Sequence, residues 1–190
     1  MERNYLLEAL LNKSKVKHKV FISYHKDDIE EVKEFIKEFS EDEEIFITRA
    51  LDMEKEIIDS KDTDYVMQRI KELYLKDSTV TIVLIGKCTW SRRFVDWEIQ
   101  SSLRQGKTLT PNGLLGVKLK SYNQNGYPDR LNKNLKQNDE QDDCYARAIN
   151  YPDNKETLQK YIDDAFNARS SRAHLIVNTR ERFEYNKSCS

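Results

Sequence analysis

A carboxylate stands at the margin of an apolar helix face predicted within residues 91–105. With about 100° between successive helical residues, Val95, Ile99 and Leu103 fall together on the side that should pack on a sheet. Glu98 lies at the edge of that face, where its carboxylate would be partly removed from water. Such a group can act as a general base or hold the hydroxyls of a sugar. On spacing alone, the pattern favours a surface glutamate paired with nearby arginines.

An indole side chain lies nearly opposite to this carboxylate on the same helix. Trp97 either covers the far side of the helix beneath a long loop or the C-terminal tail, or is exposed and anchors a partner. The pattern slightly favours the covered position.

Five β-rich segments alternate with amphipathic ones and must position these groups. Strands are expected at 19–24, 44–48, 79–86, 114–119 and 145–150, and helices at 27–39, 63–75, 91–105 and 154–168. This alternation predicts an α/β fold with a doubly wound parallel sheet in the flavodoxin-like order 2-1-3-4-5. In that order the ligand crevice opens between strands one and three, so residues 23–28 and 87–93 should line it.

Flanking segments divide the chain of 190 residues. We expect an N-terminal helical extension at 1–17, one domain at 18–169 and a C-terminal tail at 170–190. The segment 120–143 is rich in Asn, Gln and Asp, and a polar loop of this length is usually functional or mobile. The short run 173–177 is compatible with a strand or with part of a helix.

Charge and hydropathy exclude several classes of partner. The formal net charge is −1, which argues against a basic nucleic-acid surface. No apolar run approaches the roughly 20 residues of a membrane helix, and the N-terminus lacks a secretion signal.

The three cysteines, Cys88, Cys144 and Cys189, are widely spaced without a CxxC pair. We therefore expect a cytoplasmic chain with reduced thiols, no disulfide framework and no metal site.

Common nucleotide and phosphate motifs are absent. The run 106–108 matches the end of a phosphate-binding loop, but Ser101 stands where that loop needs glycine. A receiver domain would share the acidic pair Asp27 and Asp28, yet it also needs an aspartate at the end of strand three, where the sequence has 85–87, Ile-Gly-Lys. Neither G-x-G-x-x-G after a strand nor G-x-S-x-G occurs.

Two segments carry a family resemblance. KVFISYHKDD, at 19–28, is similar to the first conserved box of TIR domains. VLIGKCTWSRRFVDWEI, at 83–99, resembles the TIR-like family of Thoeris anti-phage systems, the ThsB-like proteins. The resemblance covers roughly 19–168 and is strongest at 80–106.

This resemblance implies an activity and a site. Enzymatic TIR domains cleave NAD+ between nicotinamide and ribose, and Thoeris-type ones make a cyclic ADP-ribose isomer that activates an effector protein. Their essential glutamate lies four residues after an aromatic residue, which is matched here by Glu98 and Phe94, although many members have Trp in place of Phe. NAD+ would be the substrate, and no cofactor or metal is required.

The other site residues follow from the same resemblance. Ser23, Tyr24 and His25 would line the nucleotide, and Arg92 or Arg93 could meet its diphosphate or instead form surface salt bridges. The loop 49–62 would lie over the site, and Asp52 is its candidate site residue. Alternatives remain a non-catalytic interaction module that self-associates, and a sensor that binds a nucleotide without cleaving it.

Overall fold

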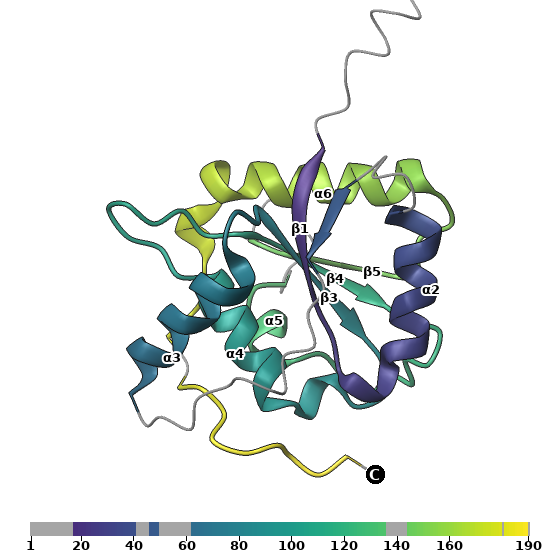
Figure 1. Cartoon of the computed structure of the whole chain (residues 1–190), viewed down its shortest axis with the longest axis horizontal. Coiled ribbons are helices and arrows are strands. Elements are labelled where there is room, and N and C mark those ends of the chain that lie inside the picture. The colour runs from purple at the N-terminus through teal and green to yellow at the C-terminus, as the bar shows by residue number, and fades with distance from the viewer. Residues whose placement is uncertain (1–16, 41–45, 50–61, 136–143, 180, 190) are drawn as a thin grey trace, which may run out of the picture.

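A parallel sheet is the centre of the computed structural model, which describes residues 17–40, 46–49, 62–135, 144–179 and 181–189. Its strands are β1 (His18–Ser23), β2 (Phe46–Arg49), β3 (Val80–Ile85), β4 (Gly113–Lys118) and β5 (Arg147–Ile149). They lie in the order β2-β1-β3-β4-β5, and every neighbouring pair is parallel (Figure 1). The carboxyl ends of the strands therefore meet at one edge, where the segments after β1 and β3 are neighbours.

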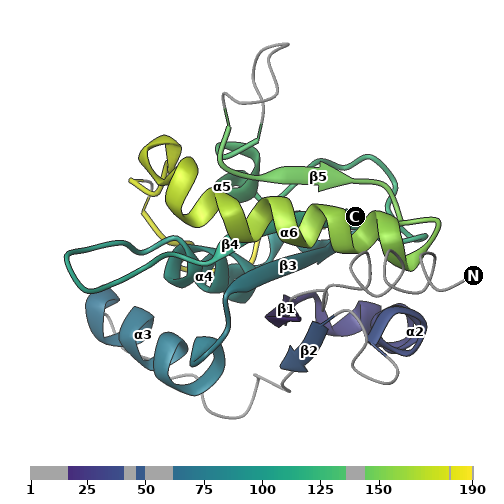
Figure 2. The same ribbon diagram turned by 90° about the horizontal axis from the view of Figure 1, so that it is seen from above.

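Helices flank both faces of the sheet (Figures 1 and 2). On one side lie α2 (Ile29–Ser40) and α6 (Lys155–Ser171). On the other side lie α3 (Thr63–Ile70), α4 (Arg93–Ser102) and the short α5 (Asp129–Asn132). The expected α/β class with a parallel sheet and flanking helices is confirmed, and it is consistent with a flavodoxin-like fold.

Strand β3 is buried along its whole length between β1 and β4. Its run of β-branched and aliphatic residues suits a strand that is covered on both faces. Side chains alternate across it, so Ile82 and Leu84 pack toward α2 and α6, whereas Val83 and Ile85 pack toward α4.

The predicted apolar face of α4 is confirmed. Val95, Ile99 and Leu103 are buried in one cluster with Val83 and Ile85 of β3. The helix is shorter than the expected 91–105 because residues 89–91 form a separate 3₁₀ turn before it. Because this face packs on the sheet, α4 is rotated so that Glu98, at the edge of the face, points toward the sheet.

Other expected segments differ from the structure or lie outside it. The segment 120–143 contains helix α5 within its described part. In the run 173–177, expected as a strand or as part of a helix, residues 173–175 form a 3₁₀ turn. The predicted N-terminal extension, apart from residue 17, lies outside the described residues, as does Asp52 with nearly all of its loop.

Candidate functional site

Glu98 is buried at the carboxyl edge of the sheet, on the side of α4 that faces β1. Only 4% of the residue is exposed, and its Oε2 atom has no hydrogen-bond partner in the structure. Burial raises the pKa of this carboxyl to about 8, and the neighbouring Ser23 hydroxyl opposes the rise. A surface glutamate paired with arginines, which spacing alone favoured, is therefore not what the fold builds.

Ser23, the last residue of β1, supplies the nearest polar group. The side chains of Phe21 and Ser23 share the α3–α4 face of the sheet, because residues two apart on a strand point the same way. The Ser23 hydroxyl is close enough to Glu98 to favour the charged carboxylate, but it makes no hydrogen bond of full geometry. The hydroxyl therefore leaves Glu98 Oε2 without a hydrogen-bond partner.

A histidine and an arginine face each other across the same edge. His25 is buried just after β1, and its Nε2 atom lies 3.1 Å from Asp27 Oδ2. Burial, and next to it the positive charge of Arg92, lower the pKa of His25, so the ring is mainly neutral at neutral pH. The Nε atom of Arg92 is itself buried without a hydrogen-bond partner. This unpaired cationic donor suits an anionic ligand group.

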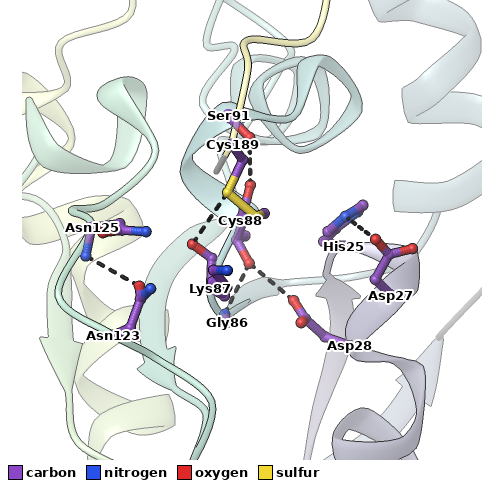
Figure 3. Close-up of a disulfide and its surroundings, with 11 residues drawn as sticks. His25, Asp27, Asp28, Gly86, Lys87, Cys88, Ser91, Asn123, Asn125 and Cys189 are labelled. Atoms are coloured by element: carbon purple, nitrogen blue, oxygen red, sulfur yellow. Dashed lines mark hydrogen bonds and ion pairs between the residues drawn. A yellow bond between two sulfur atoms is a disulfide. The ribbon is translucent and has the colours of Figure 1, made fainter.

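A threonine ties the two loops of the crevice together. Thr89 Oγ1 donates to Asp28 Oδ2 at 3.2 Å and accepts from the Gly86 amide at 2.9 Å. Gly86 lies close to Asp28 (Figure 3), and a Cβ atom at this glycine would collide with the Asp28 carboxylate. Burial raises the pKa of Asp28. The sequence placed Asp28 and Thr89 within the two segments expected to line the crevice, but it did not give either residue a role in the site.

Two other predicted site residues, Tyr24 and Phe94, pack against different parts of the core. Tyr24 packs against the core on the α2–α6 side, opposite to Ser23, as the alternation of the strand requires. Phe94 lies edge-to-face with Trp97 at 5.6 Å between ring centroids, in the cluster that includes Phe21 and α3. The structure thus brings Ser23 to the carboxylate and places Arg92 near His25, whereas the ring of Tyr24 lies on the other face of the sheet.

Arg93 contacts the C-terminal tail. Its backbone N–H donates to Asn186 Oδ1 at 2.9 Å, and its guanidinium donates to the Glu184 carbonyl at 3.3 Å. The guanidinium also lies 4.8 Å from the centre of the Phe94 ring. Of the two adjacent arginines, only Arg92 has a buried nitrogen left without a partner.

The tail also covers Trp97. The indole Nε1 donates to the Phe183 carbonyl at 2.7 Å, and only 5% of Trp97 is exposed. The covered position that the sequence pattern slightly favoured is confirmed, and the expectation of an exposed partner anchor is wrong. The reason is that residues 181–189 return along α4, which spacing within the helix cannot reveal.

Cys88 and Cys189 form a disulfide, contrary to the expectation of three reduced thiols. Their Cα atoms lie 5.7 Å apart although 101 residues separate them in sequence. The folded tail brings them together, so wide spacing in the sequence was no argument against a pair. Cys144 is a free, buried thiol.

The arrangement suits binding and charge stabilisation at a sugar–phosphate ligand. The segments that follow β1 and β3 carry a buried carboxyl beside a serine hydroxyl, and a neutral imidazole near an arginine with an unpartnered buried nitrogen. Within the described ranges, no three His, Cys, Asp or Glu side chains are grouped so that they could hold a metal ion. No helix in the described part of the chain has the length and apolar character needed to cross a membrane.

Comparison with known families agrees with this geometry. A search of curated proteins found no match to the chain. Residues 21–124 match the family of the TIR-like domain of the Thoeris protein ThsB. The matched region is more than half of the chain and includes Ser23, His25, Arg92 and Glu98. The chain therefore belongs to the family of ThsB TIR-like domains of Thoeris systems.

Proposed function

We propose that this protein cleaves NAD+ at the bond between nicotinamide and ribose, with Glu98 as its essential carboxylate. Family membership supports a signalling role in defence. The observation that carries the enzymatic proposal is the buried, unsatisfied Glu98 carboxyl at the carboxyl edge of β1 and β3. A purely structural glutamate at this depth would be expected to have a cationic or hydrogen-bonding partner for each oxygen.

The chemistry needs one carboxylate. Nicotinamide leaves as a neutral molecule, taking the bonding electrons into its cationic ring, so no general acid has to protonate it. The ribose carbon then resembles an oxocarbenium ion, as in glycoside hydrolysis. Glu98 would hold the ribose hydroxyls and stabilise the positive charge, and Arg92 would meet the diphosphate. Attack by water gives ADP-ribose, and attack by an atom of the adenine ring gives a cyclic isomer.

The charge state of Glu98 fits a cationic substrate. With a pKa of about 8, the Glu98 carboxyl is mainly protonated at neutral pH. A nicotinamide cation brought beside it favours the carboxylate by direct attraction. Binding of the charged substrate would therefore itself generate the group that stabilises the transition state, and a neutral analogue would lack this effect.

The decisive experiment compares wild type with Glu98→Gln for release of nicotinamide from NAD+. Gln keeps the size and burial of the side chain but cannot carry the charge, so we expect a loss of at least about 100-fold. Glu156→Gln, at an exposed position on α6, is the matched control and should retain full activity. Both purified protein and lysate of phage-infected cells serve as samples, because such enzymes can be silent before a trigger arrives.

The outcomes separate the alternatives. Equal turnover by wild type and Glu98→Gln in every sample rules out the catalytic assignment. Calorimetric binding of NAD+ or ADP-ribose without turnover in any sample indicates a nucleotide sensor. For an active protein, the released nucleotide identifies the product. That product can then be used to find any effector protein that responds to it.

A further inference from the structure

The last described residues form a strap, defined as 181–189, that lies along α4. Phe183 makes both of its backbone hydrogen bonds to this helix, to Asp96 Oδ2 at 2.9 Å and from Trp97 Nε1 at 2.7 Å. Lys187 donates from its backbone N–H to the Ser91 carbonyl at 2.9 Å and pairs with Asp129 of α5 at 3.0 Å. These non-covalent contacts hold the strap against α4 and place its C-terminal end near the start of the helix.

The Cys88–Cys189 disulfide fastens this end to the β3–α4 loop, defined as residues 86–92 (Figure 3). The same loop is pinned on its other side to Asp28 through Thr89, and it contains Arg92. It is thus held between the strap and the opposite wall of the crevice. Both cysteines are half-buried, so a small dithiol can reach the bond.

We propose that Cys88–Cys189 is a thiol–disulfide exchange site that latches the strap to the β3–α4 loop. A dithiol reductant attacks one sulfur as a thiolate, forms a mixed disulfide and then closes to its own cyclic disulfide, and its two protons end on the Cys88 and Cys189 sulfurs as thiols. The two electrons come from the reductant. The non-covalent contacts of Phe183 and Lys187 keep Cys189 near Cys88 after reduction, so an oxidant restores the bond readily.

The latch controls access to Glu98, and this part of the inference rests on the proposed function. In the oxidised form Glu98 and Ser23 are buried, so a substrate reaches the carboxyl only after a surrounding segment moves. The β3–α4 loop is the wall that carries Arg92, and the disulfide restrains it. Reduction frees this loop and opens the crevice.

The first test needs no catalytic activity. Alkylation of the native full-length chain, followed by peptide mass mapping, should find Cys88 joined to Cys189, with all three thiols free after dithiothreitol. Hydrogen exchange at residues 86–92 and 186–189 should then quicken by about tenfold, and exchange within β4 should stay unchanged. Cys189→Ser should show the fast exchange without reductant, whereas Cys144→Ser should retain the latch.

The results discriminate between the latch and the enzymatic proposal. Free Cys88 and Cys189 in the protein after mild oxidation, or identical exchange of the oxidised and reduced forms, overturns the latch whatever the activity. If exchange behaves as expected and the protein is active, nicotinamide release should rise about tenfold on reduction, and Cys189→Ser should be insensitive to dithiothreitol. Equal turnover of the two forms overturns control of access. A protein inactive in both forms, as purified and in lysate of phage-infected cells, refutes the proposed function and leaves the exchange result standing.

Discussion

At the scale of single residues, the site is governed by how deeply one carboxyl is buried. Desolvation raises the pKa of Glu98, and the neighbouring Ser23 hydroxyl opposes this rise. Arg92 is near His25, where it lowers the imidazole pKa, instead of neutralising Glu98. The protein thus keeps a carboxyl and a guanidinium at one crevice without pairing them, which leaves both for a ligand.

Removing the Ser23 hydroxyl should shift the pH dependence of the reaction. Since this hydroxyl favours the charged carboxylate, Ser23→Ala should raise the pKa of Glu98 above its value of about 8. Activity that needs the carboxylate rises as pH increases through this pKa, so the rising limb of kcat/KM should move to higher pH. Ser101→Ala, which loses only a bond to the Met67 carbonyl, should leave the limb in place. A limb that stays fixed or moves down in Ser23→Ala would contradict the role of this hydroxyl.

At the scale of elements, a buried ion pair holds α4 in place. Arg130 of α5 and Asp96 of α4 are fully buried and pair through two contacts, at 3.2 and 3.4 Å. Arg130 also donates to Asn178 Oδ1 at 2.8 Å and to the Glu181 carbonyl at 3.3 Å. One side chain therefore joins α5, α4 and the segment leading into the strap, and α4 carries Glu98 two residues after Asp96.

Breaking this buried pair should lower the free energy of unfolding far more than breaking an ion pair on the surface. Arg130→Met leaves Asp96 buried without its cation, so we expect the free energy of unfolding to fall by about 3–5 kcal/mol. Arg69→Met, which removes an exposed pair with Glu72, should cost at most about 1 kcal/mol. Urea unfolding of both variants measures the difference. Similar losses for the two would show that the Arg130 pair contributes no more than a surface contact.

At the scale of the whole molecule, burial of Glu98 couples global stability to pH. The folded state binds the Glu98 proton up to about pH 8, whereas the unfolded chain releases it near its ordinary value of 4.5. Between these values the folded state holds more protons, so unfolding becomes easier as pH rises. The stabilising effect of this proton is complete below the unfolded pKa and is lost as pH passes through the folded one.

Glu98→Gln should remove this pH dependence. Subtracting its unfolding free energy from that of wild type cancels the other titrating groups, and the difference should fall by about 1.4 kcal/mol per pH unit between roughly pH 5 and 8. Wild type should therefore lose stability relative to the variant as the solution becomes more alkaline. Thermal or urea unfolding across this range provides the measurement. A difference that stays flat would mean that Glu98 is ionised in the folded protein at all these pH values.

The sequence by itself determined the elements and the local faces. Alternating β-rich and amphipathic segments predicted the α/β class, because strand burial and helix periodicity are encoded by neighbouring residues. The spacing of Val95, Ile99 and Leu103 predicted which side of α4 packs on the sheet. The two recognised segments also contain Ser23 and Glu98, which the fold brings together.

Only the tertiary structure decided how far Glu98 is buried, which arginine stays unpaired and how the tail is held. Spacing within a helix places a residue at an edge, but its exposure depends on the strand and loops across from it. Arg93 and Trp97 meet residues about 90 positions later, and Cys88 meets Cys189 across 101 positions. Such contacts depend on how the whole chain packs, so local sequence patterns cannot predict them.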